Sequence, residues 1–319
     1  MLVLNEAETR AATPFRGLIE AIRSMFRSGC VMPQRHHHDV EVPGETDATL
    51  LLMPAWVPGG HIGVKMVSVF PGNAQRGLPA IFGSYLLSSG RTGQLLAVLD
   101  GAELTARRTA AASALAADYL ARKDASTMLM VGTGRLSENV IEAHALIRPL
   151  TRVMIWGRDP KKAELVAHRV ARLGLQAEVA GNLGEAASQA DIISCATLST
   201  EPLIHGEWLK PGSHLDLIGA FKPSMRESDD TAVKRASIYV DTREGATSEA
   251  GDIVQPLRAG IISLTDIRAD LAELCKASHS GRGTADEITL FKSVGAASED
   301  LAAAIFAVAH VKALPGNEG

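Results

Sequence analysis

The stretch Met128-Leu-Met-Val-Gly132-Thr-Gly134-Arg-Leu-Ser137 decides the fold. An apolar run typical of a buried strand leads into two glycines, and a helical pattern begins directly after them. A dinucleotide site needs no side chain at the first turn, close backbone approach to the pyrophosphate at the second glycine, and a small residue where helix and strand pack. Ser137 stands where Gly or Ala is usual, and it is small enough. The alternative interpretation is a plain glycine turn.

Short apolar runs and helical patterns alternate around this stretch. Alternation of this kind indicates a parallel, doubly wound sheet of the Rossmann type. The expected strands are 128–131, 153–156, 176–180, 192–196, 214–218, 238–240 and 288–292, and the expected helices are 136–146, 160–173 and 296–313.

The chain before Gly101 has a different texture. Residues 15–26 carry apolar side chains at helical spacing, which predicts an amphipathic helix. Four runs rich in strand formers follow at 50–56, 62–70, 80–87 and 94–99, separated by Gly and Pro but not by helices. This spacing predicts an antiparallel sheet, followed by a long alanine-rich helix over 102–122. The fold class is therefore α/β: a Rossmann-type sheet plus an α+β domain with antiparallel strands.

Composition limits the classes of function. The 319 residues suffice for about two domains. Lysine and arginine number 32 against 36 aspartates and glutamates, and aromatic residues make up 4%, so a nucleic-acid partner is not expected. The longest apolar run, 301–309, is too short to span a membrane.

The cysteines and the N-terminus indicate a compartment. Cys30, Cys195 and Cys275 lie far apart and form no CxxC motif, which argues against a disulfide framework or a cysteine zinc site. Charged residues at 6, 8 and 10 interrupt the segment where a signal peptide would be apolar. We therefore expect a cytoplasmic protein without a membrane partner.

The end of the second predicted Rossmann strand bears on cofactor choice. An NAD site wants a carboxylate at this strand end to bond the ribose 2′-hydroxyl, but the sequence has Trp156-Gly157-Arg158-Asp159. The Arg158 guanidinium suits a 2′-phosphate, so the sequence favours NADPH, with NADH as the weaker alternative. In the other interpretation, Asp159 takes the ribose and Arg158 is a solvated surface charge.

Several charged residues lie outside the Rossmann pattern. Lys65 stands in the middle of an apolar strand, so it either reaches an exposed face or is buried with a partner. Arg107 and Arg108 are most simply a charged helix face. Three consecutive histidines, 36–38, follow Arg35; neighbours on an extended strand point to opposite faces, so we expect a polar loop there and no metal site.

Six segments together resemble the ornithine cyclodeaminase/mu-crystallin family. They are Gly63-Val-Lys-Met-Val-Ser, Leu104-Thr-Ala-Arg-Arg-Thr-Ala-Ala, Val131-Gly-Thr-Gly, Ser194-Cys-Ala-Thr197, His214-Leu-Asp-Leu-Ile-Gly-Ala220 and Leu290-Phe-Lys-Ser-Val-Gly-Ala-Ala-Ser-Glu-Asp-Leu301. Each is loose by itself, but all six run in the family's order.

The resemblance implies a homodimer of two-domain chains. A substrate and dimerisation domain would comprise 1–115 and 300–319, and a Rossmann domain would comprise 116–299. Lys65 and Arg108 would act as catalytic residues around the substrate carboxylate, together with Arg35, and Phe221 would add an apolar wall. The expected cofactor-binding residues are Gly132, Thr133, Gly134, Arg135, Leu136, Ser137, Arg158, Thr197, Ile218, Gly219, Lys292 and Val294.

One departure from the family pattern concerns the reaction. Ornithine cyclodeaminases resemble each other in an Asp at the position of Phe221, and their proton transfers need such an acid or base. Asp216 lies five residues earlier and is not expected to replace it. Reduction of a ready-made cyclic imine has simpler needs, because the enzyme must only grip the carboxylate, orient the imine and exclude water.

The expected activity is therefore reduction of Δ1-pyrroline-2-carboxylate to L-proline, with Δ1-piperideine-2-carboxylate to L-pipecolate as a further candidate. Ornithine cyclodeamination and alanine dehydrogenase-like oxidation of an amino acid remain alternatives. A third is a non-catalytic protein that binds NADPH or a small ligand, similar to mu-crystallin.

Overall fold

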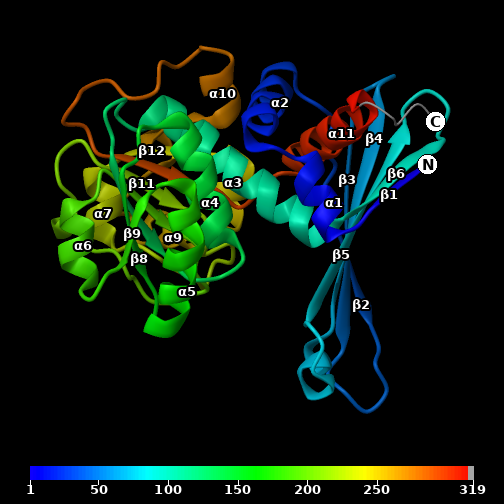
Figure 1. The fold of residues 1–319 in the computed structure, drawn as a ribbon, viewed down its shortest axis with the longest axis horizontal. Coiled ribbons are helices and arrows are strands. Elements are labelled where there is room, and N and C mark those ends of the chain that lie inside the picture. Colours follow the sequence, from blue (N-terminus) through cyan, green and yellow to red (C-terminus); the bar gives the residue numbers. More distant parts are fainter. Residues whose placement is uncertain (315–319) are drawn as a thin grey trace. The chain divides into compact units, whose positions relative to one another are not determined.

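The computed structural model describes residues 1–314 (Figure 1). The chain forms two compact units, Met1–Arg108 with Ala297–Gly319, and Thr109–Ala296. The first cut falls inside the helix α3, Gly101–Leu120, and the second falls at the start of the helix α11, Ala297–Ala313. The boundaries expected from sequence, 115/116 and 299/300, lie in the same two helices.

A six-stranded sheet is the centre of the first unit. Its strand order is β1-β6-β5-β4-β3-β2, and every pair is antiparallel except β1 with β6. The strands are β1 Leu2–Leu4, β2 His36–Val40, β3 Ala48–Trp56, β4 His61–Val69, β5 Ile81–Ser89 and β6 Leu95–Asp100. The helices are α1 Glu6–Ala12, α2 Phe15–Ser28 and α11, with the short 3-10 helix η1 at Pro71–Arg76.

The predicted four-strand core of this sheet, β3 to β6, is confirmed, whereas the expected loop at the three histidines is wrong. Residues 36–38 lie in β2 and pair with residues 50–52 of β3. Pairing uses only the backbone, so an edge strand can carry polar side chains that face water. All three histidines are exposed.

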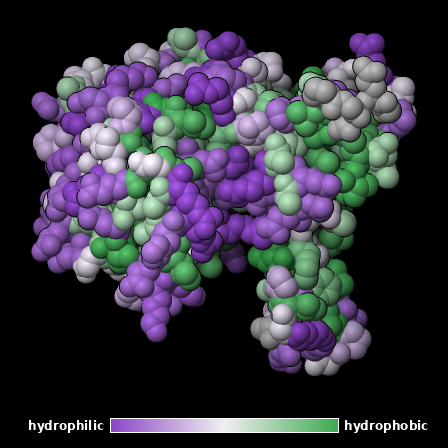
Figure 2. All heavy atoms as spheres, in the orientation of Figure 1, coloured by the Kyte–Doolittle hydropathy of each residue, from purple (hydrophilic) through white to green (hydrophobic). Residues whose placement is uncertain are grey.

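The helix α11 covers one face of the sheet, where it packs against α2, β3 and β4 (Figure 1). Lys65 and Tyr85 sit opposite each other on β4 and β5 and lie on this covered face. Because side chains alternate along a strand, Ile62, Met66 and Phe82 lie on the other face, where each is more than one third exposed. Figure 2 shows apolar residues gathered over the strands of this unit.

The second unit is a doubly wound parallel sheet of eight strands, in agreement with the predicted Rossmann type. The strand order is β13-β12-β14-β11-β10-β7-β8-β9. The strands are β7 Thr127–Val131, β8 Arg152–Trp156, β9 Gln176–Val179, β10 Ile192–Cys195, β11 His214–Leu217, β12 Ser237–Val240, β13 Ile267–Asp270 and β14 Thr289–Lys292.

Helices connect these strands. They are α4 Leu136–Ile147, α5 Pro160–Val170, α6 Leu183–Gln189, α7 Asp230–Arg235, α8 Arg243–Ser248, α9 Gly251–Arg258 and α10 Leu271–Cys275, with short 3-10 helices η2 Ala171–Leu173, η3 Gly206–Trp208 and η4 Leu264–Asp266. Strand residues of one core cluster are buried, and Leu129, Ile193 and Leu215 among them are completely buried. Runs of this kind are typical of parallel strands covered on both faces.

The order of strands reverses between β7 and β10. The chain runs from β7 outward through β8 and β9, and then returns to β10 on the other side of β7. Ligands of open α/β sheets bind outside the carboxyl ends of the strands at such a switch point. The fold therefore places the candidate cofactor site at the ends of β7, β8, β10 and β11.

Candidate active site

Lys65 and Arg108 meet on a shared carboxylate in the first unit. Lys65 Nζ donates to Asp300 Oδ2 at 2.7 Å, and Arg108 Nε donates to Asp300 Oδ1 at 2.9 Å. Arg108 Nη1 donates to Glu299 Oε2 at 2.6 Å. All four side chains are buried. The structure thus joins two cations predicted from sequence through two acids, at the start of α11, that the sequence analysis did not single out.

Burial and charge act against each other in this cluster. Burial lowers the pKa of Lys65, and Asp300 only partly counters it. The pKa of Arg108 is raised: burial acts to lower it, but Asp300 and Glu299 outweigh that effect. Burial also acts to raise the pKa of Asp300, but the two cations hold it below its usual range. The cluster is therefore an ionised network in which each charge depends on its partners.

Donors remain available on the two cations. Lys65 has three N–H groups and uses one on Asp300, while Arg108 uses Nε and Nη1 but not Nη2 on partners within residues 1–314. An ammonium and one arm of a guanidinium can hold a carboxylate. The arrangement is chemically suited to binding an acidic substrate group.

A close approach of glycine and tyrosine supports the strand that carries Lys65. A Cβ on Gly63 would overlap the Tyr85 hydroxyl and would stand 3.0 Å from Leu301 Cδ1. Only glycine leaves room there for the phenol between β4 and α11. The Tyr85 hydroxyl has no hydrogen-bond partner within residues 1–314, and burial raises the pKa of this phenol.

Arg107 and Arg35 differ in their surroundings. The expected charged helix face is wrong for Arg107: it is buried, donates from Nε and Nη2 to the Thr13 carbonyl, and lies over the Phe15 ring. Hydrogen bonds to the carbonyl and stacking on the ring replace the water that would otherwise solvate this guanidinium. Arg35 directly precedes His36 of β2 and is half-buried.

The turn after β7 in the second unit has the shape of a phosphate cradle. Gly132 adopts φ +119°, and a Cβ there would stand 2.6 Å from the Ala196 carbonyl oxygen. A Cβ on Gly134 would meet nothing within 4 Å, so its backbone lies beside open space at the start of α4. Ser137 is buried and donates to the Gly132 carbonyl at 2.9 Å, which closes the turn. These residues fit a dinucleotide, since helix-terminal amides attract phosphates.

Thr133, Arg135 and Leu136 complete this turn. Arg135 is the N-cap residue of α4 and is exposed, and Thr133 and Leu136 are half-buried. Their backbone amides lie in the segment from which a bound pyrophosphate would draw hydrogen bonds.

Arg158 and Asp159 lie beyond the end of β8. Arg158 is exposed, whereas Asp159 is the N-cap of α5 and accepts a hydrogen bond from Lys161 N at 3.1 Å. One carboxylate oxygen of Asp159 is thus engaged by the backbone of α5.

The other predicted cofactor residues gather at the carboxyl ends of β10, β11 and β14. Thr197 follows β10, Ile218 and Gly219 follow β11, and Val294 follows β14. Val294 N donates to Asp241 Oδ2 at 2.7 Å. Lys292 lies at the same end of the sheet but is completely buried. Its Nζ donates to the Gly219 carbonyl, so Lys292 fixes the backbone after β11.

Asp216 is buried in the middle of the sheet of the second unit. It accepts hydrogen bonds from Ser113 Oγ at 3.1 Å and from Ser194 Oγ, and His144 Nε2 lies 4.0 Å from its Oδ2. Burial raises the pKa of Asp216 to about 6 and lowers that of His144 to about 4. These partners hold α3 and α4 on the sheet, which is a structural role.

Phe221 lies in the loop after β11 and is 42% exposed. It can therefore present an apolar surface to a ligand, and it has no proton to transfer. The Lys222-Pro223-Ser224 segment beside it is also exposed.

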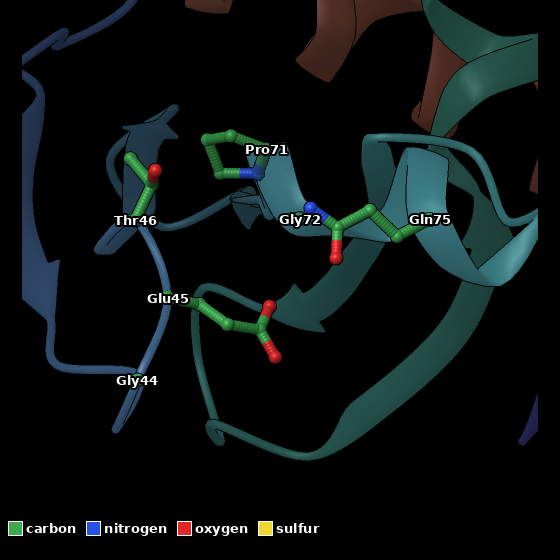
Figure 3. A pocket seen from close by; sticks show the side chains of 6 residues that line it. All are labelled: Gly44, Glu45, Thr46, Pro71, Gly72 and Gln75. Atoms are coloured by element: carbon green, nitrogen blue, oxygen red, sulfur yellow. The ribbon is translucent and has the colours of Figure 1, made fainter.

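A surface pocket contains none of the predicted site residues. It belongs to the first unit and is lined by Gly44, Glu45, Thr46, Pro71, Gly72 and Gln75, and Figure 3 shows the Glu45 and Gln75 side chains extending toward its middle. Residues 1–314 contain no group of three His, Cys, Asp or Glu side chains placed to hold a metal ion. In this same part of the chain, no helix combines the length and apolar character needed to cross a membrane.

The model of the ornithine cyclodeaminase/mu-crystallin family matches residues 2–313. The Δ1-pyrroline-2-carboxylate reductase of Paracoccus denitrificans is 36% identical over 313 residues, which cover 97% of this chain and 96% of that protein. The Thermococcus litoralis Δ1-pyrroline-2-carboxylate reductase in complex with NADH and L-proline has 32% identity and a TM-score of 0.89, covering 98% and 97% of the two chains. An archaeal alanine dehydrogenase dimer with bound NAD has 31% identity and a TM-score of 0.87, covering 98% and 96%.

Proposed function

We propose that this chain, which belongs to the ornithine cyclodeaminase/mu-crystallin family, reduces small cyclic imino acids with NADPH. It is an NAD(P)H-dependent oxidoreductase that acts on C=N bonds. The substrate we propose is Δ1-pyrroline-2-carboxylate, with L-proline as the product. The observation that carries the proposal is the buried pair Lys65 and Arg108, which keeps unused donors while both cations are held by Asp300.

The residues of the first unit bind and orient the substrate. Lys65 and Arg108 hold the carboxylate, and Arg35 adds a third positive charge from the edge of the sheet. An α-imino carboxylate held in this way has its C2 fixed beside the gripped group, which is the geometry that hydride transfer needs. NAD(P)H, when bound, supplies the hydride at C4 of the nicotinamide.

The proton balance suits a ring whose nitrogen is already protonated. The C=N bond gains a hydride at carbon, so the iminium nitrogen becomes a neutral amine without a further acid in the step. Phe221 adds apolar surface and no proton. Cyclodeamination of ornithine would instead require several proton transfers, for which an acid or base at this position is expected.

The proposed preference for NADPH rests on the residues after β8. Arg158 is exposed and Asp159 has one oxygen engaged as a helix cap, so a 2′-phosphate would find a cation there. The neighbour from Thermococcus litoralis binds NADH, and the Kd values of this chain for NADPH and NADH test the proposed preference.

The open face of the first unit supports a homodimer as the working form. Ile62, Met66 and Phe82 leave an apolar area on the sheet that a second copy would bury, and the related alanine dehydrogenase is a dimer. Light scattering should give twice the chain mass, and Met66→Asp should lower it. Leu165→Asp, on an exposed apolar residue of α5, is the matched control; equal masses for both variants and the native chain would contradict this face as the interface.

The experiment that tests the function follows NADPH absorbance after addition of Δ1-pyrroline-2-carboxylate. We expect rapid NADPH consumption and L-proline as product, and Lys65→Met should lower kcat/KM severely while the Kd for NADPH stays unchanged. Binding of NADPH without consumption would favour the non-catalytic alternative. Faster oxidation of L-alanine by NAD than reduction of the cyclic imine would favour the alanine dehydrogenase alternative.

A further inference from the structure

Three buried charged residues form a cluster behind the carboxyl ends of the central strands in the second unit. Glu227 precedes α7, Asp252 lies in α9, and Lys292 ends β14; each is completely buried. Lys292 Nζ lies 3.5 Å from Asp252 Oδ2. Asp252 Oδ1 in turn accepts hydrogen bonds from Glu227 N at 3.0 Å and from Ser228 N at 2.9 Å. We call these three residues the crevice cluster.

The crevice cluster fixes two backbone segments. Glu227 Oε1 accepts hydrogen bonds from both Thr197 N and Thr197 Oγ1, each at 2.7 Å. Lys292 Nζ donates to the Gly219 carbonyl. Thr197 and Gly219 lie two residues beyond the ends of β10 and β11. Glu227 and Lys292 therefore fix the backbone at the two strand ends beside the switch point.

Those strand ends belong to the nicotinamide half of the crevice. In a doubly wound sheet the cofactor crosses the switch point, with its pyrophosphate on the helix after the first strand. Here the first strand is β7 and the glycine turn leads into α4, so the nicotinamide half extends toward β10 and β11. The crevice cluster therefore lies behind the segment on which the redox-active ring would rest.

The charges of the crevice cluster do not balance. Two carboxylates face one ammonium, so the fully ionised cluster carries a net charge of −1. Glu227 Oε2 has no hydrogen-bond partner within residues 1–314. If Glu227 had only a structural role, we would expect this oxygen to accept a hydrogen bond, because a buried acceptor without a partner costs free energy.

We propose that the crevice cluster positions Thr197 and Gly219 for the nicotinamide, and that the charge on Glu227 favours the oxidised cofactor over the reduced one. This inference rests on the proposed function, since it requires that NAD(P) binds in this crevice. Glu227 and Lys292 are positioning residues: they act through Thr197 and Gly219 and through their field, without touching the substrate.

The sign follows from the charges of the two cofactor forms. The oxidised nicotinamide is cationic and the reduced ring is neutral, so a negative cluster attracts only the oxidised form. Burial and Asp252 raise the pKa of Glu227, Lys292 and the Thr197 hydrogen bonds oppose this, and the pKa is raised to about 7. The other ionisable groups near the cluster are Asp241, Asp216 and the Cys195 thiol. The affinity of the oxidised form relative to the reduced form should therefore rise as pH increases through about 7.

The test measures Kd for NADP⁺ and NADPH with the native chain between about pH 5.5 and 8.5, by calorimetry or by protein fluorescence. The 2′-phosphate titrates in both forms and cancels in the ratio of the two Kd values. We expect the ratio Kd(NADPH)/Kd(NADP⁺) to increase about tenfold with pH, which corresponds to a Glu227 pKa about one unit lower in the NADP⁺ complex than in the NADPH complex. A ratio independent of pH overturns the proposal.

Two variants assign the effect to Glu227. Glu227→Gln keeps an acceptor for Thr197 but cannot ionise, so the pH dependence of the ratio should disappear; Glu201→Gln, which removes an exposed carboxylate in the loop after β10, should leave it unchanged. Thr197→Val removes one hydrogen bond to the charged form, so the midpoint should move to higher pH.

The outcomes separate this inference from the proposed function. A pH dependence that persists in Glu227→Gln overturns the assignment to Glu227 while leaving the function intact. Failure of the native chain to bind either cofactor form overturns both. If Glu227→Gln does not fold, as judged by its thermal unfolding, the direction of the midpoint shift in Thr197→Val still decides the question.

Discussion

Replacing Asp300 by Asn is the most direct test of the carboxylate cluster in the first unit. The substitution keeps the shape of the side chain but removes the charge that Lys65 and Arg108 share. With an effective dielectric constant of about 20, a pair of unit charges at 2.7 or 2.9 Å interacts by about 6 kcal/mol. Arg108 keeps Glu299, and an amide oxygen still accepts one hydrogen bond, so part of this energy survives. We expect the free energy of unfolding to fall by about 3–5 kcal/mol, which is typical when one partner of a buried ion pair is removed.

The assay must report on the first unit alone. Trp56 lies in β3, next to the strand that carries Lys65, whereas Trp156 and Trp208 lie in the second unit. In a background with Trp156→Phe and Trp208→Phe, fluorescence during urea unfolding follows the unit that contains Asp300. Lys65→Met, Asp300→Asn and the double variant then form a thermodynamic cycle.

The cycle yields a coupling free energy between Lys65 and Asp300. We expect about 2 kcal/mol, because removing the ammonium after the carboxylate is gone relieves an unpaired buried charge. Asp39→Asn, an exposed carboxylate on β2 of the same sheet, should change stability by less than about 0.5 kcal/mol. Additive single effects, or a loss below about 1 kcal/mol in Asp300→Asn, would refute the shared-carboxylate arrangement.

Four further outcomes are expected. Arg158→Ala should raise the Kd for NADPH by about one to two decades and leave the Kd for NADH nearly unchanged, because one charge-assisted contact is worth about 1.5–3 kcal/mol; equal losses would remove Arg158 from the 2′-phosphate site. L-Ornithine with NAD should release at most trace ammonia, since the missing acid or base is worth about 10²–10⁴-fold, and Phe221→Asp should not fully restore release; robust release by the native chain would contradict the reductase assignment. Gly63→Ala should lower the free energy of unfolding by about 1–3 kcal/mol through overlap with Tyr85, whereas Tyr85→Phe should leave it unchanged or raise it; urea unfolding distinguishes the two. Burial lowers the pKa of His144 to about 4, so the unfolded chain binds this proton first and stability should fall as pH drops from about 6.5 to 4; His144→Gln should flatten that slope in thermal unfolding measured against pH.

The long periodic elements and the short apolar strands of the second unit could be predicted from sequence, whereas the short helices and β13 could not. The amphipathic pattern of α2 and the strand, glycines and helix around Gly132 are local signals, and each has enough residues to show a period. The helices α6 to α10 have only five to eight residues, too few for a helical period to stand out. The strand β13 reads Ile-Arg-Ala-Asp, so it lacks the apolar run that marked most other strands of this sheet.

The candidate site divides in a similar way. The glycine turn was readable because its chemistry is contiguous, but the partners of Lys65 and Arg108 are 235 and 192 residues away in the chain. Glu299 and Asp300 begin an otherwise apolar helix, which by itself indicates acids that complement a helix N-terminus. Their pairing with distant cations depends on where α11 packs, and no local pattern encodes that.

The order in which the chain is made has a consequence for when the active site exists. Residues 109–296 form a continuous unit, so they can fold while synthesis continues, whereas the first unit waits for α11. Until Asp300 leaves the ribosome, Lys65 and Arg108 have no carboxylate to pair with and the covered face of the sheet lacks its helix. A nascent chain can therefore acquire its Rossmann fold before the proposed substrate site is complete, and premature termination before α11 would leave a Rossmann unit without the proposed carboxylate-binding cluster.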